Sequence, residues 1–271
     1  MKFKQIGNPC KVYFRAPPFI NYKKYHIFAY MSGQDDLLAK LRQTLNEQGI
    51  DSFHILEDLV PIEEQMDYFR YFDRLKRENS PFVRDEEVAI LFSPNESVER
   101  KRRSLTLLAS IPDVGAYRSI ETYHSSPLEP ILLNWSSMAL VSSRIVLSSD
   151  LSGQQQVYIS SGLGGLDKKL RFFALFTTRE REALTALQRE IVEREFIFQL
   201  QQAEIVIEKF EIESNYFTIL MLFSFDRDAK SSLNAAIAEC NQYGDFLDTR
   251  FLFTNVKVLT EEEIAHLLKK K

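Results

Sequence analysis

The sequence predicts an α+β protein built as a tandem duplication of a ferredoxin-like (split βαβ) unit, with two mainly antiparallel sheets packed face to face. Three observations lead to this prediction. A stretch of the first half recurs in the second half, the predicted elements follow the same order in both halves, and the apolar residues fall where such a sheet needs them.

The repeated stretch covers residues 12–31 and 157–176. Val12-Tyr13 corresponds to Val157-Tyr158, Lys23-Lys24 to Lys168-Lys169, and Phe28-Ala29 to Phe173-Ala174. The differences 157 minus 12, 168 minus 23 and 173 minus 28 all equal 145, so a single register relates the three matches. This register indicates two copies of one unit.

The second repeat, residues 157–271, has the clearer pattern. Strands are predicted at 170–176, 203–213, 216–225 and 246–258, with a bulge near Glu208-Lys209. One helix is predicted after a Thr177–Glu180 capping box, with Leu184, Leu187, Ile191 and Phe198 on its buried stripe. Others are predicted around 233–240 and after a Thr260–Glu263 capping box. The first and third strands are apolar on both faces, as central strands are.

The first repeat is predicted at residues 1–124. Its strands are expected at 11–14, 25–31, 52–56 and 87–93, and its helix around 38–45. Its final strand is placed by matching Asp113, Arg118 and Thr122 to Asp245, Arg250 and Thr254. An extra helix at 61–78 is predicted as an insertion. Residues 125–156 are expected to form a connector with one or two strands, because serine pairs recur there every six residues.

A split βαβ sheet carries its helices on one face, so its other face needs a cover. In the second repeat that face would expose Tyr216, Leu220 and Leu222. The simplest cover is the sheet of the other repeat, and the alternative is another chain. In either case the space beside the sheet is the place to expect a ligand.

The composition limits the function classes. A net charge of −4 and a pI near 5.7 argue against a nucleic-acid partner. We find neither an apolar run of membrane-spanning length nor a signal peptide, so we predict no membrane association and a cytoplasmic location. Cys10 and Cys240 are interpreted as reduced thiols.

Four basic residues are candidates for ligand binding. His26 and Arg171 occupy matching central strands and would line the space between the sheets, and Lys168 and Lys169 form the repeated pair. The alternative is a structural role for His26 and Arg171 and solvated charge for the lysines. The four histidines lack zinc-ligand spacing, so no metal and no cofactor are predicted, and no catalytic residue is identified.

The helix at 61–78 carries more aromatic residues than one buried face needs. Tyr68, Phe69, Tyr71 and Phe72 are candidates for a partner interface, and the alternative is packing against the connector. The basic run Arg100–Arg103 is interpreted as a solvated helix face, with nucleic-acid contact as the alternative.

The sequence therefore predicts a non-enzymatic binding or assembly protein with a protein partner or self-association. The alternative is an enzyme or small-molecule sensor with its site between the two repeat sheets. Enzymatic activity is left undecided at this point, because no catalytic motif is present.

Overall fold

The computed structural model describes residues 22–26, 53–78, 80–153, 156–224 and 227–269. Contacts divide these residues into two compact units. We call residues 22–26 and 53–160 the helical unit, and residues 161–269 the sheet unit. Helices together with an antiparallel sheet confirm the α+β class.

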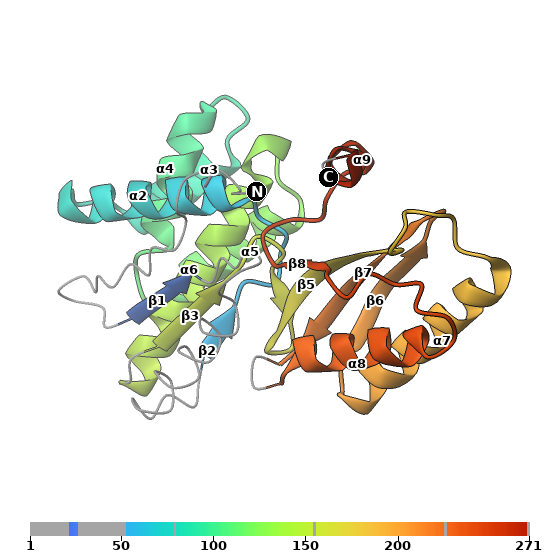
Figure 1. Ribbon diagram of the computed structural model, residues 1–271. Coiled ribbons are helices and arrows are strands. Elements are labelled where there is room, and N and C mark those ends of the chain that lie inside the picture. Colours follow the sequence, from blue (N-terminus) through green and yellow to red (C-terminus); the bar gives the residue numbers. More distant parts are fainter. Residues whose placement is uncertain (1–21, 27–52, 79, 154–155, 225–226, 270–271) are drawn as a thin grey trace. The chain divides into compact units, whose positions relative to one another are not determined.

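The helical unit combines a small parallel sheet with a helix bundle (Figure 1). Its strands are β1 (Tyr22–His26), β2 (Phe53–Ile55) and β3 (Gln156–Ser160), in the sheet order β1-β3-β2. Its helices are α2 (Ile62–Glu78), α3 (Arg84–Phe92), α4 (Val98–Leu108), α5 (Val114–Ser125), the 3-10 turn η1 (Pro130–Leu132) and α6 (Leu133–Ser152). Helix α6 is central, since it packs against α2, α4 and α5.

Helix α6 lies where the sequence predicted a connector with strands. Its buried residues include Trp135, Met138, Ala139, Ser142 and Ile145, a spacing of three and four residues that belongs to a helix. The serine pairs hid this period because several of those serines are themselves buried. Residues 130–152 are long and apolar enough to span a membrane. However, 61% of the apolar 18-residue window within them is buried inside the protein, as in a core helix.

Two further predicted strands of the first repeat are helices. Residues 87–92 fall in α3 and Ser93 follows its end, with acidic side chains in the first turn that favour the helix dipole and with Glu87 and Leu91 on the buried face. A short apolar run does not distinguish a strand from a helix by itself. Residues 113–122 form most of α5, which Asp113 caps. The extra helix predicted at 61–78 is present as α2, residues 62–78.

The sheet unit has the element order β-α-β-β-α-β that the sequence predicted. Its elements are β4 (Gly165–Leu166), β5 (Lys169–Thr177), α7 (Ala186–Gln202), β6 (Val206–Ile212), β7 (Tyr216–Phe223), α8 (Ala229–Asn241), β8 (Leu252–Thr254) and α9 (Glu261–Lys269). All pairings are antiparallel, β5 and β7 are central, and β6 shifts register between Ile207 and Lys209 as expected of the predicted bulge.

One helix of this unit starts later than predicted. The capping box forms at Thr185 and Gln188, so α7 begins at Ala186 instead of near Thr177. Leu187 and Phe198 are consequently exposed, and the buried stripe is Ile191, Val192, Phe196 and Leu200. The Thr260–Glu263 capping box is confirmed by hydrogen bonds of 3.1 and 3.3 Å.

Helices α7 and α8 cover one face of the sheet (Figure 1), and phenylalanine rings fill the space beneath them. Phe176 of β5 stacks on Phe217 with ring centroids 4.7 Å apart, and Phe196 of α7 meets both rings edge-on. A second stack joins Phe172 to Phe223 at 4.7 Å. Apolar burial of this kind is the main source of stability for the sheet unit.

The other face of the sheet is covered from within the sheet unit. Phe173 and Leu175 of β5 form a buried cluster with Ile264 of α9. Leu163, Leu259 and neighbouring side chains complete this cluster. The face that was expected to need a second sheet is therefore occupied by the C-terminal helix, and face-to-face packing of two sheets is not confirmed.

The duplication is not confirmed either, because α3, α5 and α6 occupy positions predicted to be strands. The predicted strand at 11–14, the helix around 38–45 and residues 27–31 of the central strand lie outside the described residues. The limits proposed at 1–124, 125–156 and 157–271 stay predictions. Residues 156–160 form β3, which pairs with β1 and β2 in the helical unit.

Candidate functional site

Arg171, a predicted ligand residue, has a guanidinium engaged within the sheet unit. Its Nε and Nη2 donate to the two carboxylate oxygens of Glu208 at 2.5 and 2.8 Å, and its Nη1 donates to the Leu163 carbonyl at 2.8 Å. Glu208 sits in the bulge of β6. This arrangement favours the structural alternative for Arg171.

Two of the other predicted ligand residues, Lys168 and Lys169, lie at one turn of the sheet unit. Lys168 has a positive φ of 62° and, with Asp167 at 48°, forms the tight turn between β4 and β5. Lys169 begins β5 beside this turn. His26 ends β1, and its side chain is not among those that the structure describes. Ligand binding at these residues stays a prediction.

The aromatic residues predicted as a partner interface lie largely inside the helical unit. Tyr68, Phe69 and Phe72 are buried. The Tyr68 ring lies 5.2 Å from the Trp135 ring of α6, centroid to centroid. Packing against the former connector, which was the alternative, accounts for them. Tyr71 alone of the four is half-buried and reaches a groove described below.

The basic run on α4 is divided between the interior and the surface. Arg100 donates twice to Glu87 at 2.9 Å, and Ser104 donates to the same carboxylate at 2.6 Å. Lys101 is fully buried and bonds Glu129. Arg102 and Arg103 are about one-third exposed. Lys101 is therefore closed to a ligand, whereas Arg100 is as exposed as Arg102 and Arg103.

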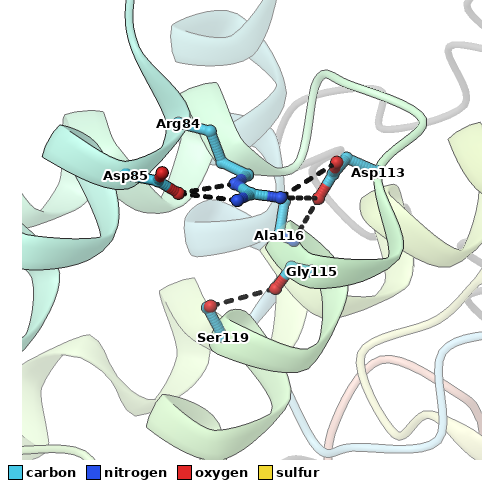
Figure 2. A network of polar contacts seen from close by, with 6 residues as sticks. All are labelled: Arg84, Asp85, Asp113, Gly115, Ala116 and Ser119. Atoms are coloured by element: carbon cyan, nitrogen blue, oxygen red, sulfur yellow. Dashed lines mark hydrogen bonds and ion pairs between the residues drawn. The ribbon is translucent and has the colours of Figure 1, made fainter.

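A polar network ties the start of α3 to the start of α5 (Figure 2). Arg84 donates to Asp85 at 2.8 Å and to both carboxylate oxygens of Asp113 at 3.3 Å. Asp113 also accepts from the Ala116 N–H at 2.7 Å. This N–H and then the Arg84 guanidinium hold the pKa of Asp113 below its usual value. The network fixes the starts of α3 and α5.

Asp58, His124 and Ser136 resemble a catalytic triad in composition. His124 Nδ1 lies 3.0 Å from Ser136 Oγ, and His124 Nε2 lies 3.5 Å from an Asp58 carboxylate oxygen. Ser136 is fully buried, and its hydroxyl donates to the Leu133 carbonyl at 2.8 Å. A substrate cannot reach such a hydroxyl, so this cluster is interpreted as packing between α5 and α6.

An open groove of about 1300 Å³ runs along α2 in the helical unit. We call it the α2 groove. It is lined by α2, by Arg102 of α4 and by residues 130–135. The lining residues are Glu64, Asp67, Arg70, Tyr71, Asp73, Arg74, Arg77, Glu78, Arg102, Pro130, Ile131, Leu133, Asn134 and Trp135.

One wall of the α2 groove carries a row of arginines. Arg70, Arg74 and Arg77 are spaced four and three residues apart, which places them on one face of α2 over about 10 Å at 1.5 Å per residue. The side chains of Arg70 and Arg74 are 71% and 61% exposed. Arg77 forms no ion pair with any described carboxylate; its Nε donates to the Asp73 carbonyl at 3.2 Å.

Aromatic rings hold two guanidinium groups in the groove. Arg74 lies 4.5 Å from the centre of the Tyr71 ring, and Arg102 lies 5.1 Å from the centre of the Trp135 ring. Arg102 Nε is buried and has no hydrogen-bond partner among the described residues. Trp135 is itself fixed by a 3.1 Å bond from Nε1 to Thr106.

Acidic residues also line the groove, but their ion pairs are exposed. Asp67 pairs with Arg70 at 3.0 Å, and Glu78 pairs with Arg74 at 3.9 Å and with Arg103 at 3.3 Å. Exposed pairs of this kind contribute about 0–1 kcal/mol each. An incoming anion can therefore take over the arginines at small cost.

Nothing in the described part of the chain offers a metal site, since no three His, Cys, Asp or Glu side chains cluster there. Cys240 is buried, and burial raises the pKa of its thiol to about 12. Neither metal chemistry nor thiolate chemistry is supported by the described residues.

No family model and no curated protein matches this chain. Among solved structures it is similar to a protein of Deinococcus radiodurans R1 assigned as a transposase. That match has 12% identity, a TM-score of 0.31, and covers 37% of this chain and 87% of the other. It is also similar to a REP-associated tyrosine transposase bound to a REP hairpin, with 13% identity, a TM-score of 0.29, and coverage of 37% and 62%.

These comparisons correct two expectations. The two solved structures are described as a transposase and as a REP-associated tyrosine transposase bound to a REP hairpin, and on this finding the expected non-enzymatic binding or assembly role and the exclusion of a nucleic-acid partner are not upheld. The overall charge of −4 was a weak basis for the second expectation, because net charge does not report how charge is distributed over the surface. The protein-partner and self-association predictions are likewise not supported.

Proposed function

We propose that this chain binds nucleic acid through the α2 groove. The observation that carries the proposal is the row of Arg70, Arg74 and Arg77 on one face of α2, with Arg102 on the neighbouring helix. Guanidinium groups bind phosphate oxygens through paired N–H donors. A row of them suits a ligand with regularly repeated phosphates.

Further support comes from the way the arginines are held. The Tyr71 and Trp135 rings restrict the Arg74 and Arg102 guanidinium groups before a ligand arrives. Less side-chain freedom is then lost on binding.

The test is fluorescence anisotropy with a labelled oligonucleotide of about 20 nucleotides, titrated at several salt concentrations between about 50 and 300 mM. The triple variant Arg70→Ala/Arg74→Ala/Arg77→Ala removes three phosphate contacts. The slope of log K against log salt is expected to fall by about 2 for a single strand, with binding at least about tenfold weaker at low salt.

The matched control is Arg194→Ala/Arg227→Ala/Arg250→Ala, which removes the same charge from exposed positions of the sheet unit. This control is expected to change the affinity and the slope much less. If the wild-type chain binds no oligonucleotide, or if both triple variants weaken binding equally, the groove is not the binding site.

A further inference from the structure

The two walls of the α2 groove differ in chemistry. Besides the arginine row, the groove is lined by two exposed apolar side chains, Ile131 at 66% and Leu133 at 47% exposure. Exposed leucine and isoleucine side chains are ordinary when single, but here two of them line the same groove as three exposed arginines.

A nucleic-acid duplex and a single strand would use these walls differently. A duplex presents its phosphates outward and keeps the faces of its bases stacked inside, so it can engage the arginines alone. A single strand presents phosphates along one side and unstacked bases along the other, and base faces pack on apolar or aromatic side chains.

We infer that the α2 groove takes single-stranded nucleic acid, with phosphates along Arg70, Arg74 and Arg77 and bases against Ile131 and Leu133. This inference rests on the proposed function and adds the ligand class to it. Exposed Ile131 and Leu133 gain from covering by a base, which a duplex cannot offer. The half-buried Tyr71 and the largely buried Trp135 also line the groove.

Carboxylates line the groove along the whole of its α2 wall. Glu64 is bonded to Asn134 at 3.0 Å, Asp67 lies one turn further along α2, and Asp73 and Glu78 lie beside Arg74 and Arg77. Phosphates are repelled from these carboxylates. A bound strand is therefore expected to displace the exposed ion pairs of Arg70 and Arg74.

The experiment compares three labelled probes of about 20 nucleotides: a single strand, the same strand with abasic sites throughout, and the matching duplex. With the wild-type chain, the single strand is expected to bind at least about tenfold more tightly than either other probe. The variant Ile131→Ser/Leu133→Ser is expected to remove most of this preference while leaving the abasic strand unchanged.

The matched control is Leu187→Ser/Phe198→Ser, which removes exposed apolar side chains from α7. It is expected to keep the preference. Thermal unfolding checks that each variant folds, and Ile131→Asn alone serves if the double variant does not. Equal binding of the three probes, or an unchanged preference in the Ile131 variants, overturns the inference. In that case the arginine triple variant still tests nucleic-acid binding itself.

Discussion

The helical unit and the sheet unit bury different kinds of side chain. The sheet unit is filled by stacked phenylalanine rings. The helical unit buries Lys101, Glu87 and several serines of α6 together with its apolar core. Buried polar groups are stable only with their partners present, whereas apolar packing depends on filled volume. The stability of the helical unit is therefore expected to depend on particular polar pairs, and that of the sheet unit on the volume filled by its apolar side chains.

A single tryptophan makes this comparison measurable. Trp135 is the only tryptophan in the sequence and lies in the helical unit, so its fluorescence follows that unit during urea unfolding. Far-ultraviolet circular dichroism follows both units. Variants that act on one unit should shift one transition and leave the other in place.

The largest expected effect is that of Phe176→Ala in the sheet unit. The ring is fully buried between Phe217 and Phe196, so its removal should destabilise the sheet unit by about 4 kcal/mol. The circular dichroism transition should move to lower urea while the Trp135 transition stays. A parallel shift of both transitions would show that the units unfold together, so that their stabilities could not be compared separately.

The next effect is that of Lys101→Met in the helical unit. The substitution keeps the buried volume but leaves the Glu129 carboxylate without its cation, which should destabilise this unit by about 3 kcal/mol. The Trp135 transition reports the loss. The double variant Lys101→Met/Glu129→Gln removes both charges and should recover part of the stability; no recovery would mean that packing alone explains the loss.

A smaller effect is expected from Arg171→Met. Loss of the bidentate bond to Glu208 and of the bond to Leu163 should cost about 2 kcal/mol in the sheet unit. The control Lys209→Met breaks the exposed pair with Glu211 and should cost about 0–0.5 kcal/mol. Equal stability of Arg171→Met and the wild type would return Arg171 to the candidate ligand residues.

The smallest effect concerns the Asp113 cap of α5. Asp113→Ala should destabilise the helical unit by about 1 kcal/mol at pH 7. The folded pKa of Asp113 is lowered, so the carboxylate contributes stability above its unfolded pKa, and this contribution is lost as the pH falls through the folded value.

The variant Asp113→Asn isolates the charge. Its side-chain oxygen still caps the helix, so most of the stability at pH 7 should remain, and the loss below about pH 4 should be smaller than in the wild type. Unfolding followed by Trp135 fluorescence at pH 7 and pH 3 measures both. Identical acid sensitivity of the two proteins would remove the assigned role of the charge.

Local signals predicted the sheet unit well. Strands β5 and β7 are apolar on both faces, the bulge near Glu208 follows from the change of face along β6, and Thr260 with Glu263 marks a helix start. Each of these features depends on residues that are close in sequence. The helical unit was predicted poorly because its buried serines disguised the period of α6.

The apparent repeat misled the prediction for a related reason. Helices and strands use the same apolar residues, so three short matches at one offset did not establish that residues 87–93 form a strand. The sequence showed only part of the α2 groove. The spacing of Arg70, Arg74 and Arg77 could be read from the sequence, whereas their approach to Ile131 and Trp135 depends on packing between distant segments.

The cover that α9 provides has a consequence for synthesis of the chain. Every strand of the sheet precedes residues 261–269, so a ribosome completes the sheet before the helix that shields Phe173 and Leu175 has emerged. During that interval the nascent chain exposes an apolar surface of the type that chaperones recognise. Folding of the sheet unit is therefore complete only after residues 261–269 have been synthesised and have packed on this face.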